Sequence, residues 1–543
     1  MGRKIDFVAG DVEFFGSRSV SRRSPRAERA ARVTTPHRRE TLAAMRVRPS
    51  LLLSLAPALF APALACSSSS SSGASSPGDG GTGDDGGGPA TLSYTPRGCG
   101  YTYTPPPTLG YLDLALDDTG PVSATAGKPE RVRVGLGGGT TKGQAGYADP
   151  STSAAFTWET AEPNHAAKVK IGTSAASMTT VQTGYAWTLK PTLGSNAYFH
   201  EVHLCGLTPG TTYFYAVGGG PAGQEVWSDP LSFTTVPSSG SITVGVFGDA
   251  RDSATTWQAV HVRMRDAMAS LSLVGGDVVD IGGEETFYTQ WLDAIVSDPS
   301  GKPLTLGRMP ILVINGNHEA DTSTSFANFA LPGTDAYPET YASFDVGNTH
   351  FTMLDDQQIA ESLMSGTASP EAKAQLAWVD KDLAAASADR AAHPFVVVVA
   401  HRGIFSTSVH GADPDVLAAR AALAPLYDKY GVDLVLNGHD HEYERTAPLT
   451  AGTPPTGSPA IAAGGKGTTY VTCAGAGADA YGAGTATPWR TKSATFGTGT
   501  PYIGVYSLLT LSGSTLTLSA YGLKASSTTV KGDDVVDTLQ LTH

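Results

Sequence analysis

Hydrophobic and polar positions alternate along several short runs between residues 128 and 237. The runs read RVRVGLG, AAFTWET, AKVKIGT, AYFHEVHLCGL, TYFYAVGG and LSFTTV, and turn residues separate them. A period of two is typical of a strand that buries one face and exposes the other. Short strands at this spacing predict an antiparallel β-sandwich over residues 128–237.

After residue 237 the pattern changes to apolar, strand-like runs that alternate with segments of helical spacing. The expected strands are 242–247, 271–274, 311–314, 341–346, 350–354, 395–400, 432–436, 467–473 and further strands within 505–521. The expected helices are 255–271, 284–296, 370–386 and 413–430. Alternating strands and helices predict an α/β layered domain over residues 241–523.

Side chains that can bind metal ions follow five of these strands. They are Asp249, Asp277, Asn317, His401, and the pair His439 and His441. Because the carboxyl ends of parallel strands meet at one edge of a sheet, we expect these side chains to gather there. The histidine pair alone fits a solvated polar turn better than a metal site, but five such loops in this order indicate an active site.

The five loops also carry a family resemblance. They read GDAR (248–251), GDVVD (276–280), GNHE (316–319), AHR (400–402) and GHDH (438–441). As a set they resemble the calcineurin-like metallophosphoesterases, and within them the purple acid phosphatases, whose motifs read GDxG, GDxxY, GNHE, a strand-end His and GHxH. HEYERT and AHRGIFST are similar to that family too. The segment LTPGTTYFYAVGG (207–219) gives the sandwich a fibronectin type III or immunoglobulin-like character.

The resemblance implies two metal ions that share the carboxylate of Asp277. One ion would be held by Asp249, Asp277 and His441, and the other by Asp277, Asn317, His401 and His439. The ions would be iron together with zinc, manganese or a second iron. A water molecule on the ions, its pKa lowered towards neutrality, would then attack phosphorus in line with the leaving group.

Two histidines are expected to face the substrate. By resemblance, His318 would hydrogen-bond the phosphate or protonate the leaving oxygen, and a supporting role beside the ligands is its alternative. His410 occupies one position of a substrate-facing pair found in plant members of the family, and Gly411 replaces the other. Glu319 and Asp440 are expected to support the ligands without touching the ions.

Two positions depart from the family pattern. Asp280 stands where the family has a tyrosine ligand, and Arg251 stands where purple acid phosphatases have glycine. An arginine stays protonated and cannot ligate a metal, so we expect Arg251 either to clamp the substrate phosphate or to pair with Asp280. Asp280 is either a shorter ligand or a neighbour of the ligands. The protein should therefore lack the tyrosine-to-iron absorption band.

The amino-terminal region is typical of an exported protein. Residues 45–65 have a basic start, an apolar stretch broken by prolines and a small-residue end, which indicates a signal peptide and not a membrane span. Residues 1–44 show no fold-like periodicity and are expected to be untranslated or disordered. Cys66 opens a Ser/Gly/Asp-rich linker at 66–92, so the protein is either tethered to a membrane through a lipid on Cys66 or released. Both place it outside the cytoplasm, at the cell surface, in the periplasm or in the medium.

Length, charge and cysteines add three points. A chain of 543 residues has room for two domains, and its net charge of −13 argues against a nucleic-acid partner. In an oxidising compartment Cys99 and Cys205 could form a disulfide, which would leave Cys473 free. The sequence does not decide that pairing.

The sequence thus predicts a metal-dependent, acid phosphatase-like enzyme that hydrolyses small phosphate monoesters. The loops fix the chemistry at phosphorus but not the leaving group, so a phosphodiesterase or nucleotidase is the nearest alternative. A catalytically inert surface-binding protein is the second alternative. The presence of all six metal-ligating residues argues against it, because an inert member should have lost some of them.

Overall fold

The computed structural model describes residues 93–543, except 106–110, 117–121, 126, 139–146, 148, 163–165, 192–193, 334–336, 338, 451–458, 463–465 and 483. The predicted amino-terminal segment, signal peptide, Cys66 and linker lie outside the described residues. All described residues belong to one compact unit. In this part of the chain, no helix is both long and apolar enough to cross a membrane.

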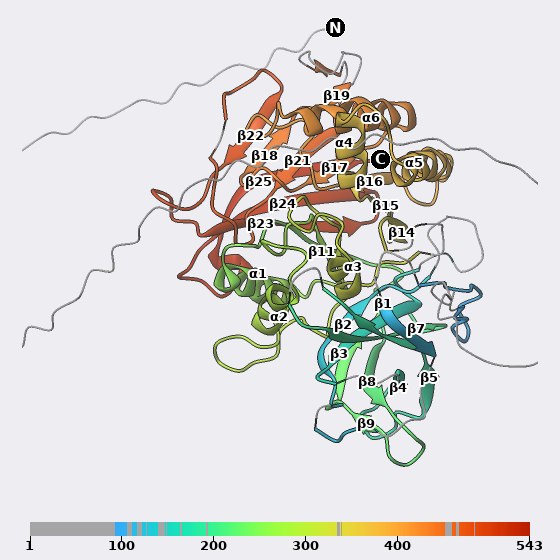
Figure 1. Cartoon of the computed structure of the whole chain (residues 1–543). Coiled ribbons are helices and arrows are strands. Elements are labelled where there is room, and N and C mark those ends of the chain that lie inside the picture. The colour runs from blue at the N-terminus through green and yellow to red at the C-terminus, as the bar shows by residue number, and fades with distance from the viewer. Residues whose placement is uncertain are drawn as a thin grey trace, which may run out of the picture. The chain divides into compact units, whose positions relative to one another are not determined.

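The amino-terminal part is a sandwich of two antiparallel sheets (Figure 1). One sheet has the order β1 (Tyr111–Leu116), β6 (Tyr185–Leu189), β7 (Ala197–Cys205), β3 (Ser153–Thr160) and β2 (Glu130–Gly135). The other has the order β10 (Leu231–Thr234), β8 (Thr212–Gly219), β4 (Lys168–Gly172) and β5 (Thr180–Thr183), and β9 (Val226–Trp227) pairs with β8. Buried aromatic and aliphatic side chains from both sheets, among them Phe156, Trp158 and Phe233, form the core between them. The predicted sandwich is confirmed.

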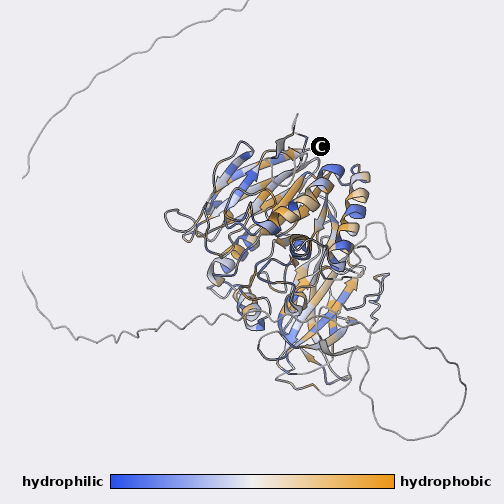
Figure 2. Cartoon of the chain, turned by 45° about the horizontal axis from the view of Figure 1, so that its top comes forward, coloured by the Kyte–Doolittle hydropathy of each residue, from blue (hydrophilic) through white to orange (hydrophobic). Residues whose placement is uncertain are grey.

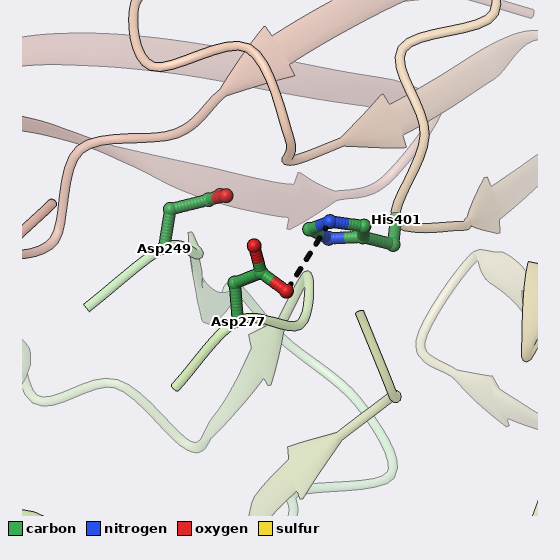
Figure 3. Close-up of side chains that lie close together, drawn as sticks. All are labelled: Asp249, Asp277 and His401. Atoms are coloured by element: carbon green, nitrogen blue, oxygen red, sulfur yellow. Dashed lines mark ion pairs between the residues drawn. The ribbon is translucent and has the colours of Figure 1, made fainter. Parts of the chain in front are cut away.

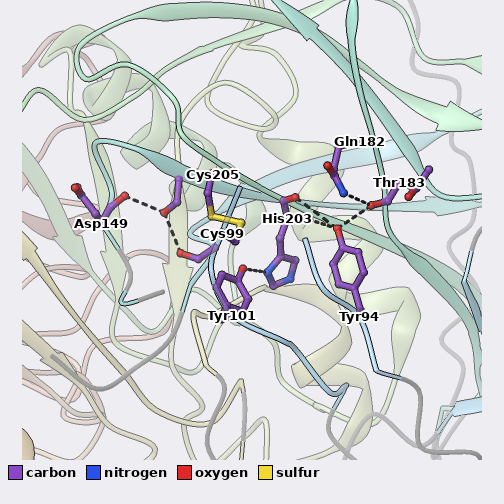
Figure 4. Close-up of a disulfide and its surroundings, with 10 residues drawn as sticks. Tyr94, Cys99, Tyr101, Asp149, Gln182, Thr183, His203 and Cys205 are labelled. Atoms are coloured by element: carbon purple, nitrogen blue, oxygen red, sulfur yellow. Dashed lines mark hydrogen bonds between the residues drawn. A yellow bond between two sulfur atoms is a disulfide. The ribbon is translucent and has the colours of Figure 1, made fainter. Parts of the chain in front are cut away.

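A disulfide joins Cys99 to Cys205 and so ties the segment before the first sheet to the end of β7 (Figure 4). Beside it, the ring of His203 lies 2.7 Å from the hydroxyl of Tyr101. Cys473 is free and buried. The structure therefore settles the pairing that the sequence left open.

The second part contains two sheets packed face to face. The first has the order β13 (Ile311–Val313), β12 (Leu271–Val274), β11 (Ile242–Phe247), β23 (Gly504–Ser512), β24 (Thr515–Leu523) and β25 (Asp534–Thr542). The second has the order β14 (Ala342–Val346), β15 (Thr349–Met353), β16 (Phe395–Val399), β17 (Leu434–Asn437), β21 (Thr469–Cys473), β18 (Tyr443–Thr446) and β22 (Arg490–Ala494). A small pair, β19 (Leu449–Thr450) and β20 (Ala460–Ile461), completes the strands described.

Alternation along the strands explains the layers. On β16, Val397 and Val399 point into the core between the two sheets, whereas Val396 and Val398 point to the helical side. Such strands are apolar on both faces because both faces are covered.

The helices cover the two outer faces (Figure 1). The second sheet packs on α4 (Asp356–Met364), α5 (Pro370–Ala388) and α6 (Pro414–Tyr430), and the first on α1 (Ala254–Asp266) and α2 (Glu285–Ala294). A short helix, α3 (Ser323–Asn328), follows β13. These helices carry hydrophobic and hydrophilic residues side by side, as Figure 2 shows. The predicted α/β layered fold is confirmed as helix, sheet, sheet, helix.

Some elements were not predicted. The strand β25 pairs with β24 along its length and continues the sheet past residue 523, where the sequence placed the end of the domain. Its solvent-facing polar residues and mixed burial hide the strand pattern. The helix α4 is only nine residues long and starts at the side chain of Asp355, which accepts a hydrogen bond from the N–H of Gln357.

Contacts join the sandwich to the α/β part. The hydroxyl of Tyr215 on β8 donates to the carbonyl of Gly307 at 2.6 Å, and the hydroxyl of Tyr103 donates to the buried carboxyl of Glu339. Arg131 on β2 lies 3.7 Å from Asp293 on α2. These contacts suit a sandwich that serves as a support for the α/β part.

Candidate metal centre

Five strand ends position the predicted metal ligands. In the first sheet, β11, β12 and β13 run parallel and lead into the loops with Asp249, Asp277 and Asn317. In the second sheet, β16 and β17 run parallel and lead into the loops with His401 and with His439 and His441. The carboxyl edges of two packed sheets therefore supply all six side chains, as the parallel-strand rule predicts.

Four of these side chains form a tight cluster. His401 Nε2 lies 3.4 Å from Asp277 Oδ1 and 3.0 Å from Asn317 Oδ1. His439 Nδ1 lies 2.8 Å from the same Asn317 oxygen and 3.2 Å from His401 Nε2. We call this group, Asp277, Asn317, His401 and His439, the four-ligand site.

The other two side chains, those of Asp249 and His441, lie next to each other. Asp249 Oδ1 lies 3.5 Å from His441 Nε2 and accepts a hydrogen bond from the backbone N–H of His439 at 2.9 Å. One ligand atom each of Asp249, Asp277 and His401 lies within 4.8 Å of the others, and Figure 3 shows the three side chains converging. We call Asp249, Asp277 and His441 the three-ligand site.

Hydrogen bonds fix how two of the imidazoles face the centre. The ring of His401 contacts the carbonyl of Gly275 at 2.6 Å through Nδ1, and that of His441 contacts the carbonyl of Asp479 at 2.6 Å, also through Nδ1. A carbonyl oxygen only accepts, so Nδ1 carries the proton in both rings and Nε2 presents its lone pair. This arrangement is the usual support of a metal-bound histidine.

The donor set fits a metal ion. In the neutral ring, His401 Nε2 is an acceptor that faces two oxygens, those of Asp277 and Asn317, and such acceptors repel one another unless a proton or a metal ion lies between them. Asp249 Oδ2 is buried without a hydrogen-bond partner, although an isolated buried carboxylate oxygen is costly. Nitrogen and oxygen ligands of this kind suit zinc, iron and manganese.

The backbone is strained where it presents these groups. Asp249, Asp277 and His439 have φ angles of 60°, 52° and 73°, in the left-handed region that non-glycine residues rarely adopt. Strain of this kind costs about 1–3 kcal/mol per residue and collects at functional sites. A Cβ added to Gly316 would lie 2.1 Å from Asp277 Oδ1, so the close approach of these loops requires glycine there.

Glu319 connects two ligand loops, those that contain Asp277 and Asn317. Its buried carboxylate accepts hydrogen bonds at 2.8 Å from the backbone N–H groups of Asp277, Val278 and Gly316. Burial, followed by the charge of Asp277, raises the pKa of Glu319 to about 7. The residue contacts the ligand loops through their backbone, as the sequence predicted for a supporting group.

Arg251 and Asp280, the two departures from the family pattern, lie next to each other. Arg251 Nη1 is 3.6 Å from Asp280 Oδ1, Nε is 3.8 Å from Asp277 Oδ2, and Nη2 is 3.5 Å from His441 Nε2. The Arg251 side chain is 13% exposed and that of Asp280 is 46% exposed. The pairing alternative for Arg251 is thus present in the structure, and its contact with a substrate stays a prediction.

The predicted substrate-facing histidines are more open than the ligands. The side chains of His318 and His410 are 27% and 31% exposed, whereas that of His441 is 1% exposed. His318 Nδ1 contacts the carbonyl of Asp280 at 2.9 Å, and His410 Nδ1 contacts the carboxylate of Asp413 at 2.8 Å. Both rings lie at the centre, and their catalytic roles stay predictions.

Sequence reasoning missed Tyr481. Its ring stacks on His441 with centroids 3.9 Å apart, and its hydroxyl accepts a hydrogen bond from Arg251 Nη2 at 3.0 Å. It also lies 5.3 Å from the ring of His410. The surrounding segment, GAGADAYGAG, contains no motif, and a lone aromatic residue among small ones was the only available signal.

The pKa values of two histidines in the centre, His401 and His439, shift in opposite directions. For His401, burial favours the neutral ring, but the charges of Asp277 and Asp249 outweigh burial and raise the pKa. For His439, burial and then the neighbouring His401 lower the pKa well below its usual value, so this ring is neutral. A neutral imidazole is the form that binds a metal.

Comparison with known proteins agrees with the fold and the loops. Residues 242–443 match the family model described as calcineurin-like phosphoesterase, and residues 141–235 match the one described as purple acid phosphatase, N-terminal domain. Together the layered fold, the edge of ligand-bearing loops and these matches define a metallophosphoesterase.

Similar sequences include purple acid phosphatases and an acid phosphatase. Purple acid phosphatase 23 of Arabidopsis thaliana is 29% identical over 290 residues, covering 46% of this chain and 58% of the relative. Acid phosphatase type 7 of Homo sapiens is 27% identical over 270 residues, with the same two shares. The chain is a purple acid phosphatase-like member of the calcineurin-like metallophosphoesterase superfamily. It spans a little over half the length of these relatives.

A solved structure supports the same fold. The purple acid phosphatase from yellow lupin (Lupinus luteus) seeds superposes with a TM-score of 0.58 at 18% identity, covering 77% of this chain and 74% of that one.

Proposed function

We propose that the protein hydrolyses phosphate monoesters with the help of a pair of metal ions. The observation that carries this proposal is the convergence of six ligand side chains from five strand ends, with His401 Nε2 3.4 Å from the shared carboxylate of Asp277 and His441 Nε2 3.5 Å from that of Asp249. When bound, two ions supply a water of lowered pKa and positive charge that attracts the phosphoryl group. Iron with zinc, manganese or a second iron is the pair we propose.

The side chains around the centre would then bind the phosphate group and protonate the leaving oxygen. Asn317 contributes a neutral oxygen, so the ligand set keeps few negative charges and leaves room for an anionic substrate. His318 follows the ligand Asn317 in the chain, and its side chain is 27% exposed. It would donate a proton to the leaving oxygen. Arg251, which contacts His441 and Asp277, and the more exposed His410 offer N–H donors to the phosphate oxygens.

A diesterase or nucleotidase using the same residues is the second candidate. The residues His318, His410 and Tyr481 favour neither reaction, because their side chains can hydrogen-bond the phosphate of a monoester or of a diester. The inert binding protein is less well supported, since all six ligands lie together.

A direct comparison tests the proposal. Zinc- or iron-loaded full chain should hydrolyse p-nitrophenyl phosphate faster than bis-p-nitrophenyl phosphate, and Asp277→Asn should abolish both activities. Glu130→Gln, a half-exposed carboxylate on the sandwich, serves as the matched control. The reverse preference would favour the diesterase, and no hydrolysis of either ester would favour the binding protein.

The compartment is a proposal as well. We infer an extracytoplasmic protein that is secreted or anchored through a lipid on Cys66. Labelling of wild-type protein, but not of a Cys66→Ser variant, by a fatty-acid probe in the producing cells would show the anchor.

A further inference from the structure

The cationic side chain of Arg251 contacts one half of the metal centre. The guanidinium of Arg251 is 3.5 Å from His441 Nε2 and 3.8 Å from Asp277 Oδ2, which are two of the three groups of the three-ligand site. On the other half, the nearby Arg402 directs its guanidinium away, to Asp415 at 2.7 Å and Gln357 at 2.6 Å. The two halves therefore differ in whether a guanidinium group contacts the ligands directly.

They also differ in geometry. Ligand atoms of the four-ligand site lie 2.8–3.4 Å apart. Those distances are mostly a few tenths of an ångström shorter than the edges of a tetrahedron with bonds of about 2.0–2.2 Å, which are about 3.3–3.6 Å, so the four groups would move slightly apart to hold an ion. In the three-ligand site, by contrast, the lone pair of His441 Nε2 already faces an N–H group of Arg251. The guanidinium nitrogen Nη2 lies 3.5 Å from this ring nitrogen, so an ion bound to His441 Nε2 would lie close to the positive charge of Arg251.

Several contacts hold Arg251 in this position. Its Nη2 donates to the hydroxyl of Tyr481 at 3.0 Å, and its Nη1 pairs with Asp280 at 3.6 Å and with Asp252 at 3.9 Å. Its Nε is buried and has no hydrogen-bond partner. Arg251 is thus anchored at its tip, while its inner nitrogen faces the shared carboxylate of Asp277 without a full hydrogen bond.

We propose that Arg251 makes the centre asymmetric, so that the four-ligand site binds its ion first and tightly and the three-ligand site binds second and weakly. The second ion must displace the guanidinium from His441 and Asp277. Asp280 and Tyr481 receive the displaced group, because both already contact its outer nitrogens. The inference rests on the proposed function only in requiring that the centre binds metal ions.

Charge sets the expected size of the effect. One positive charge a few ångströms from a divalent ion weakens binding by about tenfold or more, even at the dielectric constant of water. Arg251→Gln is shorter and keeps a hydrogen-bonding amide but removes the charge, so it should tighten the second binding step by about that factor and leave the first unchanged. Arg251→Lys keeps the charge and should leave the second step weak.

Calorimetric titration of metal-stripped full chain with Zn²⁺ tests this, with zinc counted per chain after desalting. We expect two resolved steps for wild type, with one zinc retained. His439→Ala should weaken the tight step, which assigns it to the four-ligand site. Arg490→Gln is the matched control, because this guanidinium contacts Thr407 and Gly484 and none of the six ligands.

Three outcomes overturn the proposal: equal affinities for two ions in wild type, an unchanged second step in Arg251→Gln, or a tightened first step. Failure to bind any zinc would overturn the proposed function too, so the two failures are distinct. A second measurement uses the wild type alone, so that the proposal can still be tested if Arg251→Gln fails to fold. One equivalent of Mn²⁺ should give an isolated-ion paramagnetic spectrum, and a spin-coupled spectrum at one equivalent would contradict ordered binding.

Discussion

The carboxylate of Glu319 accepts a hydrogen bond from the backbone N–H of Asp277 at 2.8 Å, across 42 positions of sequence. Two further N–H groups, those of Val278 and Gly316, bind the same carboxylate at 2.8 Å. Asp277 has a strained φ of 52°, so its position as the shared ligand depends on contacts that hold its backbone. Glu319 supplies one of these contacts directly and three more through the neighbouring N–H groups of Val278, Val279 and Gly316.

Glu319→Gln should therefore weaken both stability and metal retention. The amide has one accepting oxygen in place of two and turns an N–H₂ group towards a backbone donor, which leaves buried N–H groups unpaired at a cost of about 1–3 kcal/mol. We expect a lower free energy of unfolding in urea and less zinc per chain after desalting. Glu130→Gln should change neither, since its side chain is 53% exposed. Full zinc retention in Glu319→Gln would show that these backbone contacts do not position the ligands.

The iron-loaded protein should not be purple. The band of purple phosphatases needs a tyrosine on iron, and the position of that tyrosine holds Asp280. Tyr481 is close to the centre, but its hydroxyl is bound to Arg251, and burial raises its pKa above the usual value. We expect no visible charge-transfer band in the Fe³⁺-loaded wild type, and the same spectrum in Tyr481→Phe. A band that disappears in Tyr481→Phe would instead make Tyr481 a ligand that replaces the missing tyrosine.

His318 should matter most for esters with poor leaving groups. A general acid contributes about 10²–10⁴-fold when the leaving oxygen needs a proton, whereas p-nitrophenolate leaves without one. We expect His318→Ala to lower kcat for phenyl phosphate far more than for p-nitrophenyl phosphate.

His410→Ala provides the contrast, because His410 is paired with Asp413 and is expected to bind the phosphate. It should raise KM for both esters to a similar extent. Equal losses of kcat on both esters for His318→Ala would assign His318 to support of its neighbour Asn317 and not to proton transfer.

The sequence predicted the ligand-bearing edge because a general rule connects pattern to position. Apolar runs ending in Asp277 or His401 had to be buried strands, and the ends of parallel strands meet. No such rule reaches Tyr481, which lies on an irregular segment after β21 and contacts His441 only through tertiary packing. The role of Glu319 was predicted in kind but not in detail, since its partners are backbone N–H groups that carry no sequence signal.

The same reasoning explains the missed elements. The strand β25 exposes most of its polar residues at the end of a sheet, and the apolar period that marks a buried strand is weak there. The disulfide between Cys99 and Cys205 depends on how β7 lies against the preceding segment, which spacing alone does not determine.

Away from the metal centre, His350 should make stability depend on pH. This buried histidine on β15 has a carboxylate at each ring nitrogen, Asp345 at 2.8 Å from Nδ1 and Asp382 at 3.1 Å from Nε2. Burial favours the neutral ring, but the two carboxylates outweigh burial and raise the pKa to about 9. The charged ring is therefore favoured in the folded state over the unfolded one, whose pKa is about 6.5.

The sign follows from this order of pKa values. The stabilisation is fully present below about pH 6.5, and it is lost as the pH rises towards 9, because the folded protein then gives up a proton that the unfolded chain has already lost. A shift of this size corresponds to about 3 kcal/mol. Urea unfolding at pH 6, 7.5 and 9 should show this decline in wild type and in His543→Gln, whose histidine is exposed. His350→Gln should remove most of the decline and be less stable at pH 6. An unchanged slope in His350→Gln would mean that the imidazole is neutral between its two carboxylates, and that other groups cause the loss of stability at high pH.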